Sequence, residues 1–268
     1  MVLAIDVGNT NTVLGLYRLA SEGVAAEMVA NWRITTPSRR TIDEFGMLLR
    51  NLFALKGLEL DVVDGIAISS VVPPLDSTLR QVCEIYFKVK PLLIEPGVKT
   101  GLPVLTDNPT EVGADRIVNC VAAFERFGGA CIVVDMGTAT TFDVVSKKGE
   151  FLGGAIAPGL GISADALFTR AARLPRIDVK KPAKVIGTGT VDNIQIGLYY
   201  GYIGLVDGIL ERMIAEMGPE TNTVATGGLA KLIAGGSKYI GAVDEMLTLT
   251  GLRIIYERNL ERHKKRGI

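Results

Sequence analysis

The chain opens on two apolar runs separated by a polar turn. Met1 to Ile5 is apolar, Asp6 to Thr12 contains acidic, amide, hydroxyl and glycine residues, and Val13 to Tyr17 is apolar again. Short apolar runs on either side of a glycine-containing turn predict a β-hairpin. Its polar side chains would gather at its tip.

After this hairpin, segments with the apolar spacing of strands alternate with segments that have the apolar spacing of helices. Short buried runs predict strands, and apolar residues recurring every three to four positions predict helices. The expected strands are 28–35, 65–70, 91–94, 130–134, 142–145, 153–157 and 223–226, and the expected helices are 41–55, 75–87, 111–127, 158–173, 190–217, a segment from 227 and 248–265. Hairpins followed by alternating helices and strands predict an α/β chain with mixed sheets.

The opening pattern occurs twice. An apolar run that ends in Asp, followed by one apolar residue, a glycine and small hydroxyl residues, is found at Asp6 and again at Asp135. We interpret this as a duplicated domain with one such turn in each half, and we place the halves at 1–115 and 116–268. A cleft between the halves would bring both turns to one ligand.

These turns suit a phosphate ligand. Glycine allows a bulky anion close to the backbone, and exposed turn amides donate to phosphate oxygens. The hydroxyls of Thr10 and Thr12 add donors, and Asp6 can hold a cation or its waters. A third glycine turn, Thr226-Gly227-Gly228, lies where a strand passes into a helix. For any one turn, the alternative is an ordinary polar loop.

Composition narrows the class of protein. The 268 residues are 48% apolar and 22% charged, with a formal net charge of zero, so a large core is expected and disorder is not. This balance gives no electrostatic footprint for nucleic acid or membrane. No apolar run approaches the roughly 18 residues of a spanning helix, and no leader-like segment opens the chain. We expect a cytoplasmic protein.

Histidine and cysteine chemistry is disfavoured. The three cysteines, Cys83, Cys120 and Cys131, are scattered among apolar residues, and the single histidine, His263, lies in a basic tail. This pattern fits buried thiols in a reducing compartment, and it offers no base beside a nucleophilic cysteine. If the protein is an enzyme, its base is a carboxylate or a lysine.

Seven segments together resemble one known family. They are Asp6-Val7-Gly8-Asn9-Thr10, 96–102, 108–116, Asp135-Met136-Gly137-Thr138-Ala139-Thr140, 153–159, 186–190 and Thr226-Gly227-Gly228. The turns are similar to those of the acetate and sugar kinases, heat-shock chaperone ATPases and actin. Within that superfamily the chain resembles the type III pantothenate kinases, and the matching segments span nearly the whole sequence in order.

The resemblance implies a fold, a reaction and an assembly. The fold would be two ribonuclease H-like (actin-like ATPase) domains, with mixed sheets flanked by helices. The reaction would be phosphorylation of pantothenate by ATP, the first step of coenzyme A biosynthesis. The resemblance also implies a homodimer, a monovalent cation (potassium or ammonium) and Mg²⁺ with the nucleotide.

The resemblance assigns a role to each matching residue. Asp135 would bind the monovalent cation, Thr138 would contact ATP, and Asp115 would be the catalytic base. Thr190 would reach pantothenate across the dimer interface. The ATP phosphates would be held by Asp6, Val7, Gly8, Asn9, Thr10, Asn11, Thr12 and Val13, and pantothenate by Gly113, Ala114, Asp115 and Arg116.

Other readings of these residues stay open. Asp115 can cap or neutralise its helix terminus, Thr190 can be the N-cap of the helix after it, and Arg116 can serve structure or pair with the substrate carboxylate. Thr106 stands where the family commonly has a tyrosine near pantothenate. The alternative functions are phosphorylation of another small alcohol on the same fold and a nucleotide-binding regulatory protein without turnover.

Overall fold

The computed structural model describes residues 1–37, 39–171 and 173–266, with side chains described as far as residue 260. The side chains of the basic tail from Arg262 to Arg266 therefore lie outside the description. The chain divides into two compact units. Unit 1 contains 1–102, 108–122 and 248–268, and unit 2 contains 103–107 and 123–247.

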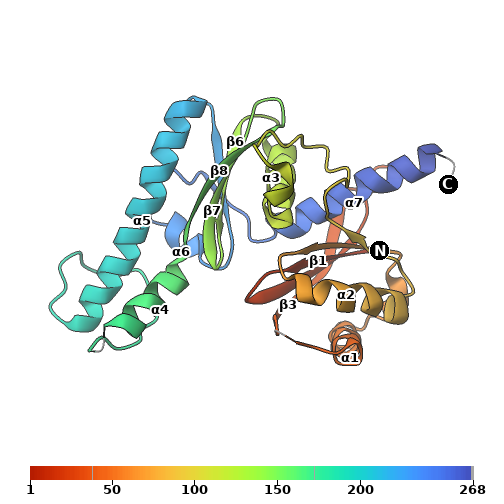
Figure 1. Cartoon of the computed structure of the whole chain (residues 1–268), viewed down its shortest axis with the longest axis horizontal. Helices are drawn as coiled ribbons and strands as arrows, with labels where there is room; N and C mark the ends of the chain where they lie inside the picture. The colour runs from red at the N-terminus through yellow and green to blue at the C-terminus, as the bar shows by residue number, and fades with distance from the viewer. Residues whose placement is uncertain (38, 172, 267–268) are drawn as a thin grey trace. The chain divides into compact units, whose positions relative to one another are not determined.

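Unit 1 is built on a five-stranded mixed sheet (Figure 1). Its strands are β1 (Val2–Val7), β2 (Asn11–Arg18), β3 (Glu27–Thr35), β4 (Gly65–Ser70) and β5 (Leu92–Leu93), in the order β3-β2-β1-β4-β5. The first three strands pair antiparallel, and β4 and β5 continue the sheet in parallel. The opening hairpin and the three other expected strands of this unit are confirmed.

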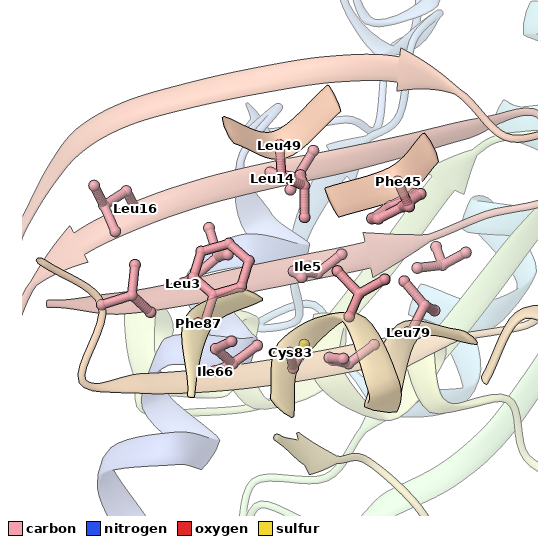
Figure 2. Packing of buried hydrophobic residues seen from close by; sticks show 14 of the residues in the cluster. Leu3, Ile5, Leu14, Leu16, Phe45, Leu49, Ile66, Leu79, Cys83 and Phe87 are labelled. Atoms are coloured by element: carbon pink, nitrogen blue, oxygen red, sulfur yellow. The ribbon is translucent and has the colours of Figure 1, made fainter. Parts of the chain in front are cut away.

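One face of this sheet packs on two helical segments. They are α1 (Ile42–Ala54) and α2 (Pro73–Val82), and a π-helical turn, η2 (Cys83–Phe87), extends α2. Figure 2 shows Leu3, Ile5 and Ile66 on this face, because residues two apart along a strand share a side of the sheet. Thr41 caps α1 in a capping box with Glu44, so the expected helix start is confirmed.

The other face carries small residues that admit a helix from the far end of the chain. A Cβ on Gly15 would lie 2.9 Å from Leu249, and a Cβ on Gly65 would overlap the Tyr256 ring. Both contacts belong to α7 (Leu247–Arg266). This packing places the last helix in unit 1, whereas the sequence division at residue 115 put it in the second half.

Helix α3 (Ala114–Phe127) lies against α7 and contributes to both units. A Cβ on Gly251 of α7 would overlap the carbonyl of Val118, and Thr248 donates to Asn119 Oδ1 at 2.7 Å. The N-terminal part of α3 belongs to unit 1 and its last turn to unit 2. The observed division therefore falls inside this helix and not at its start.

Unit 2 repeats the sheet of unit 1. Its strands are β6 (Cys131–Met136), β7 (Ala139–Val145), β8 (Phe151–Pro158), β9 (Asn222–Thr226) and β10 (Ala242–Val243), in the order β10-β9-β6-β7-β8. Taken from β8, this order and its parallel and antiparallel pairings match those of unit 1. Both units therefore have the same topology, as the repeated Asp–Gly pattern predicts. The two-residue strand β10 was not expected.

Three helices complete unit 2. They are α4 (Leu160–Arg170), the long α5 (Thr190–Met217) and the short α6 (Ala230–Ala234). Buried residues of α5 such as Tyr199, Tyr202 and Val206 join the sheet residues Ile132 and Phe142 in one core. No helix in the described part of the chain has both the length and the apolar character needed to cross a membrane.

The aromatic packing around the single tryptophan gives a test of the unit 1 core. Phe53 stacks on Trp32 with ring centroids 4.9 Å apart and meets Phe87 edge-on at 5.8 Å. We expect Phe53→Ala to lower the free energy of unfolding by about 3–5 kcal/mol through lost burial and a cavity. Urea unfolding followed by Trp32 fluorescence measures this change.

The matched control for this variant is Leu55→Ala. Leu55 is 82% exposed just after the same helix, so its truncation should change stability by no more than about 0.5 kcal/mol. Equal effects of the two substitutions would contradict the packing described.

Candidate active site

The tip of the first hairpin is a four-residue turn. Val7 and Thr12 are the last residues paired in the β1–β2 ladder, and the Gly8 amide donates to the Asn11 carbonyl at 3.0 Å. A Cβ on Gly8 would lie 3.1 Å from that carbonyl oxygen. The two residues between them, Asn9 and Thr10, are exposed. A tight turn with an open tip is a geometry in which backbone amides receive an anion.

The residues that flank the tip are less exposed. Thr12 is 1% exposed, and its hydroxyl shares a hydrogen bond of 2.8 Å with the Thr36 hydroxyl. Asp6 is half-buried opposite Val13 on β2 and Ser69 on β4. The Thr12 hydroxyl, expected at the tip as a phosphate donor, is therefore used to hold the chain after β3 against the hairpin.

The Gly113–Arg116 segment begins α3 in the same unit. The Asp115 carboxylate accepts a hydrogen bond from the Arg116 amide at 2.8 Å. A Cβ on Gly113 would lie 2.6 Å from Asp115 Oδ1, so a side chain at 113 would displace this carboxylate. Glycine at 113 therefore makes room for Asp115. In the first turn of α3 the helix dipole also stabilises the charged carboxylate. This is consistent with the alternative role of Asp115 as a group that neutralises its helix terminus.

Burial changes the acidity of Asp115. Desolvation raises the pKa of this carboxyl above the usual aspartate range, and the Arg116 amide and charge offset only part of the increase. Removal from water destabilises the charged form, which makes the carboxylate a stronger proton acceptor than an exposed aspartate. This property is typical of a general base.

The second hairpin is tighter than the first. Gly137 and Thr138 lie between β6 and β7, and both are exposed. The Gly159 amide donates to the Thr138 carbonyl at 3.0 Å, and a Cβ on Gly159 would overlap that carbonyl. The start of α4 is therefore packed directly on the turn that carries Thr138.

Gly227, in the turn after β9, lies in close contact with Asp135 of this hairpin. Gly227 has a φ of 94°, and a Cβ there would lie 2.6 Å from the Met136 carbonyl oxygen and 2.8 Å from Asp135 Oδ1. A carboxylate and a carbonyl oxygen thus face the same small space beside the glycine. Such oxygens are the ligands that hard cations prefer. The described residues contain no group of three or more His, Cys, Asp or Glu side chains placed for a metal ion.

One residue of this site was not expected from the sequence. Tyr202 of α5 shares a short, buried hydrogen bond with Thr140, which lies opposite Met136 in the second hairpin. Tyr199 and Tyr202 are in the core, and Tyr200 is exposed. The hydroxyl partner of Tyr202 is 62 residues away, so no local pattern reveals it.

Thr190 lies at the start of α5. It is the first helical residue and is exposed, whereas Gly189 is the N-cap and makes no side-chain hydrogen bond. The expectation that Thr190 is the cap is therefore wrong by one position. Its side chain lines an open, mostly apolar groove of about 400 Å³ between α4 and α5, together with Leu167, Asn193 and Leu198.

Some of the expected site residues lie in unit 1 and the others lie in unit 2. Unit 1 contains the first hairpin and the Gly113–Arg116 segment, and unit 2 contains Asp135, Thr138 and Thr190. Each hairpin lies at the same place in its own sheet, after the central strand β1 or β6.

Comparison with known proteins identifies the family. The model of the type III pantothenate kinase family matches residues 2–212. A type III pantothenate kinase of Koribacter versatilis is 63% identical over 99% of this chain and 98% of its own length. A type III pantothenate kinase of Acidobacterium capsulatum is 61% identical over 100% of this chain and 98% of its own length. The chain belongs to the type III pantothenate kinase family.

Solved structures place this family member among related folds. A Campylobacter jejuni protein described as a conserved putative Baf family transcriptional activator has a TM-score of 0.59 at 20% identity, covering 97% of this chain and 99% of its own. A putative 2-dehydro-3-deoxygalactonokinase from Sinorhizobium meliloti has a TM-score of 0.59 at 15% identity, covering 96% of each chain. At these identities the likeness shows the fold alone, and the observed pair of mixed sheets flanked by helices is the α/β arrangement expected from the sequence.

The tyrosine pair on α5 tests how the second hairpin is held. Tyr202→Phe leaves the buried Thr140 hydroxyl without this partner, so we expect a loss of about 1–3 kcal/mol in the free energy of unfolding. Tyr199→Phe is the matched control, because the buried Tyr199 hydroxyl has no hydrogen-bond partner among the described residues.

Removal of the Tyr199 hydroxyl should leave the free energy of unfolding unchanged or raise it. Guanidinium unfolding followed by circular dichroism measures both variants. A larger loss in Tyr199→Phe than in Tyr202→Phe would contradict this assignment.

Proposed function

We propose that the protein transfers the γ-phosphoryl group of ATP to the primary hydroxyl of pantothenate, the first step of coenzyme A biosynthesis. The observation that supports this most is identity of 63% and 61% to type III pantothenate kinases over the full chain. Burial raises the pKa of Asp115, which favours its role as a general base.

The two hairpins serve the nucleotide in this proposal. The segment from Asp6 to Val13 holds the ATP phosphates through the amides of its open turn, and Thr138 contacts ATP from the second hairpin. Phosphoryl transfer requires mainly positioning of the reacting groups and neutralisation of charge. The glycine-containing turns of the two hairpins supply the positioning.

Asp115 takes the proton in this proposal. The substrate hydroxyl oxygen attacks the γ-phosphorus, the bond from phosphorus to the bridging oxygen of ADP breaks, and the hydroxyl proton passes to the Asp115 carboxylate. Gly113, Ala114 and Arg116 bind pantothenate beside this base. The guanidinium of Arg116 suits the substrate carboxylate, since its donors match a carboxylate in pairs.

The charge of the phosphates requires cations. We assign a monovalent cation, potassium or ammonium, to Asp135, because its carboxylate and the Met136 carbonyl face the space that Gly227 leaves open. Mg²⁺ accompanies ATP, and these cations supply charge neutralisation when bound.

We also propose that the protein is a homodimer through unit 2. Along α5, Gly197, Gly201 and Gly204 have no heavy atom within 4 Å of a Cβ placed on them. The chain before α5 exposes Val185 (65%) and Ile186 (83%). Open glycines beside exposed apolar side chains suit close packing of a second copy. Thr190 would then reach pantothenate bound to the partner.

A coupled ADP assay tests the proposed function. ATP, Mg²⁺ and potassium are supplied with pantothenate or with one of a panel of small alcohols and sugars. We expect ADP formation that depends on pantothenate and needs potassium or ammonium. Turnover of another alcohol in its place would assign a different kinase reaction. Calorimetric binding of ATP and pantothenate without turnover would instead indicate a regulatory protein.

The pH profile tests the role of Asp115. A base must be deprotonated to act, so kcat/KM should fall as the pH falls through the pKa of Asp115 in the folded protein. Because burial raises this pKa, the acid limb should lie above the value of about 3.9 usual for aspartate. A steady-state profile from pH 4 to 9 measures it. A rate that stays constant down to about pH 4 would exclude a base with a raised pKa.

The cation site is tested by Asp135→Asn. Loss of the carboxylate charge should raise the potassium concentration that gives half-maximal activity by about ten-fold or more, because a charged oxygen ligand is replaced by a neutral one. Glu220→Gln removes a charge from an exposed position of the same unit and should leave this concentration unchanged. Potassium titrations at constant ionic strength compare the variants. An unchanged potassium requirement in Asp135→Asn would move the cation elsewhere.

A further inference from the structure

The chain between β3 and α1 is fastened to the first hairpin. The Thr36 amide donates to the Thr10 carbonyl at 3.0 Å, and the Thr36 and Thr12 hydroxyls share the 2.8 Å hydrogen bond already described. These two bonds join the residues after β3 to the tip and to the second strand of the hairpin. Arg40 follows four residues later, immediately before the N-cap Thr41.

Arg40 lines a small cavity beside this hairpin. The cavity has a volume of about 10 Å³ and is lined by Val7 and Thr12 of the hairpin, by Arg40, and by core residues that include Phe45 and Leu79. Figure 2 shows Phe45 and Leu79 nearer the arrowhead of β1 than Leu3 is. The guanidinium carbon is 5.6 Å from the centroid of the Phe45 ring.

One nitrogen of Arg40 lacks an acceptor. Its Nη1 atom is buried and makes no hydrogen bond to any described residue. The nearest carboxylate in sequence, Glu44, already accepts from the Thr41 amide at 2.8 Å and the Thr41 hydroxyl at 3.0 Å. Those hydrogen bonds are the main reason that the pKa of Glu44 is lowered, and the nearby charge of Arg40 lowers it a little further. Glu44 is therefore committed to capping α1.

A buried guanidinium donor without an acceptor is unfavourable, and such a group calls for an explanation. The cavity is about the size of one water molecule, so it has no room for an anion. An anion that accepts a hydrogen bond from Arg40 Nη1 would therefore lie outside the cavity. The adjacent hairpin is the part of unit 1 with an open glycine turn suited to phosphate.

We propose that Arg40 is a further phosphate-binding residue, which acts with the first hairpin to hold the polyphosphate of a nucleotide. The guanidinium donates to phosphate directly or through the single water that the cavity admits. The identity of the nucleotide as ATP rests on the proposed function. The positive charge of Arg40 and the backbone of the exposed tip residues Asn9 and Thr10 then act on one anion from two elements joined by Thr36.

Binding measurements on three variants test this proposal. Arg40→Gln removes the charge, Arg40→Lys keeps it, and Arg39→Gln removes the same charge from an exposed neighbour. Isothermal titration with ATP, ADP and inorganic tripolyphosphate gives the dissociation constants, and steady-state assays give the KM of ATP and of pantothenate. Circular dichroism and the Tm confirm that each variant is folded.

We expect Arg40→Gln to weaken ATP and tripolyphosphate binding by about ten-fold or more, as loss of a charge-assisted hydrogen bond predicts. The KM of pantothenate should stay within about two-fold of wild type, which separates phosphate binding from a general structural role. Arg40→Lys should retain most of the affinity, and Arg39→Gln should match wild type.

Unchanged tripolyphosphate binding in Arg40→Gln would overturn the proposal, and so would an equal loss in Arg39→Gln. If Arg40→Gln does not fold, the comparison rests on Arg40→Lys. In that case the proposal is supported if the affinity of Arg40→Lys for tripolyphosphate depends on ionic strength as that of wild type does. It is overturned if this dependence is lost. The titrations need no turnover, so a wild-type protein inactive on pantothenate would refute the proposed function and leave this test intact.

Discussion

Close approach of backbone to backbone is the constraint on which the candidate site depends. The turn that carries Thr138 can lie against the start of α4 only because residue 159 has no side chain. Asp135 and the Met136 carbonyl can face the turn after β9 only because residue 227 is a glycine with a positive φ. A methyl group at either position would collide with main-chain atoms, which cannot move aside cheaply as the end of a flexible side chain can.

A weaker form of this constraint operates in unit 1. Gly113 makes room for the Asp115 carboxylate, which is a side-chain group, and a Cβ on Gly8 would lie 3.1 Å from the Asn11 carbonyl oxygen. In each case a larger residue would press on an oxygen atom of the site. The matching order of strands in the two units indicates that one sheet plan was used twice, with a glycine turn after the central strand each time. The chemistry differs because the residues around each turn differ.

Much of this arrangement could be predicted from the sequence. The repeated Asp–Gly pattern gave both hairpins, and the spacing of apolar residues gave the long helix from Thr190 to Met217 with both of its ends. These features depend on neighbouring residues, so a local pattern is enough to find them. The resemblance to a known family supplied the reaction and the roles, which the pattern alone left open.

The features that were missed depend on distant contacts. Tyr202 meets Thr140 across the core of unit 2, and α7 returns to unit 1 because small residues such as Gly15 and Gly65 admit it. The Thr12 hydroxyl turns from the expected phosphate to Thr36 because its position on β2 is buried. The place of Arg40 beside the first hairpin is visible only once the sheet is folded.

In the proposed mechanism the glycine turns bind and orient phosphate, while the proton chemistry belongs to Asp115. The most direct test is Asp115→Asn, with ATP binding by calorimetry and single-turnover phosphoryl transfer to pantothenate measured on the same folded preparation. We expect an ATP dissociation constant within about two-fold of wild type and a transfer rate lower by about 10²–10⁴-fold, as loss of a general base implies. Transfer at the wild-type rate, or loss of ATP binding in parallel with transfer, would contradict this mechanism.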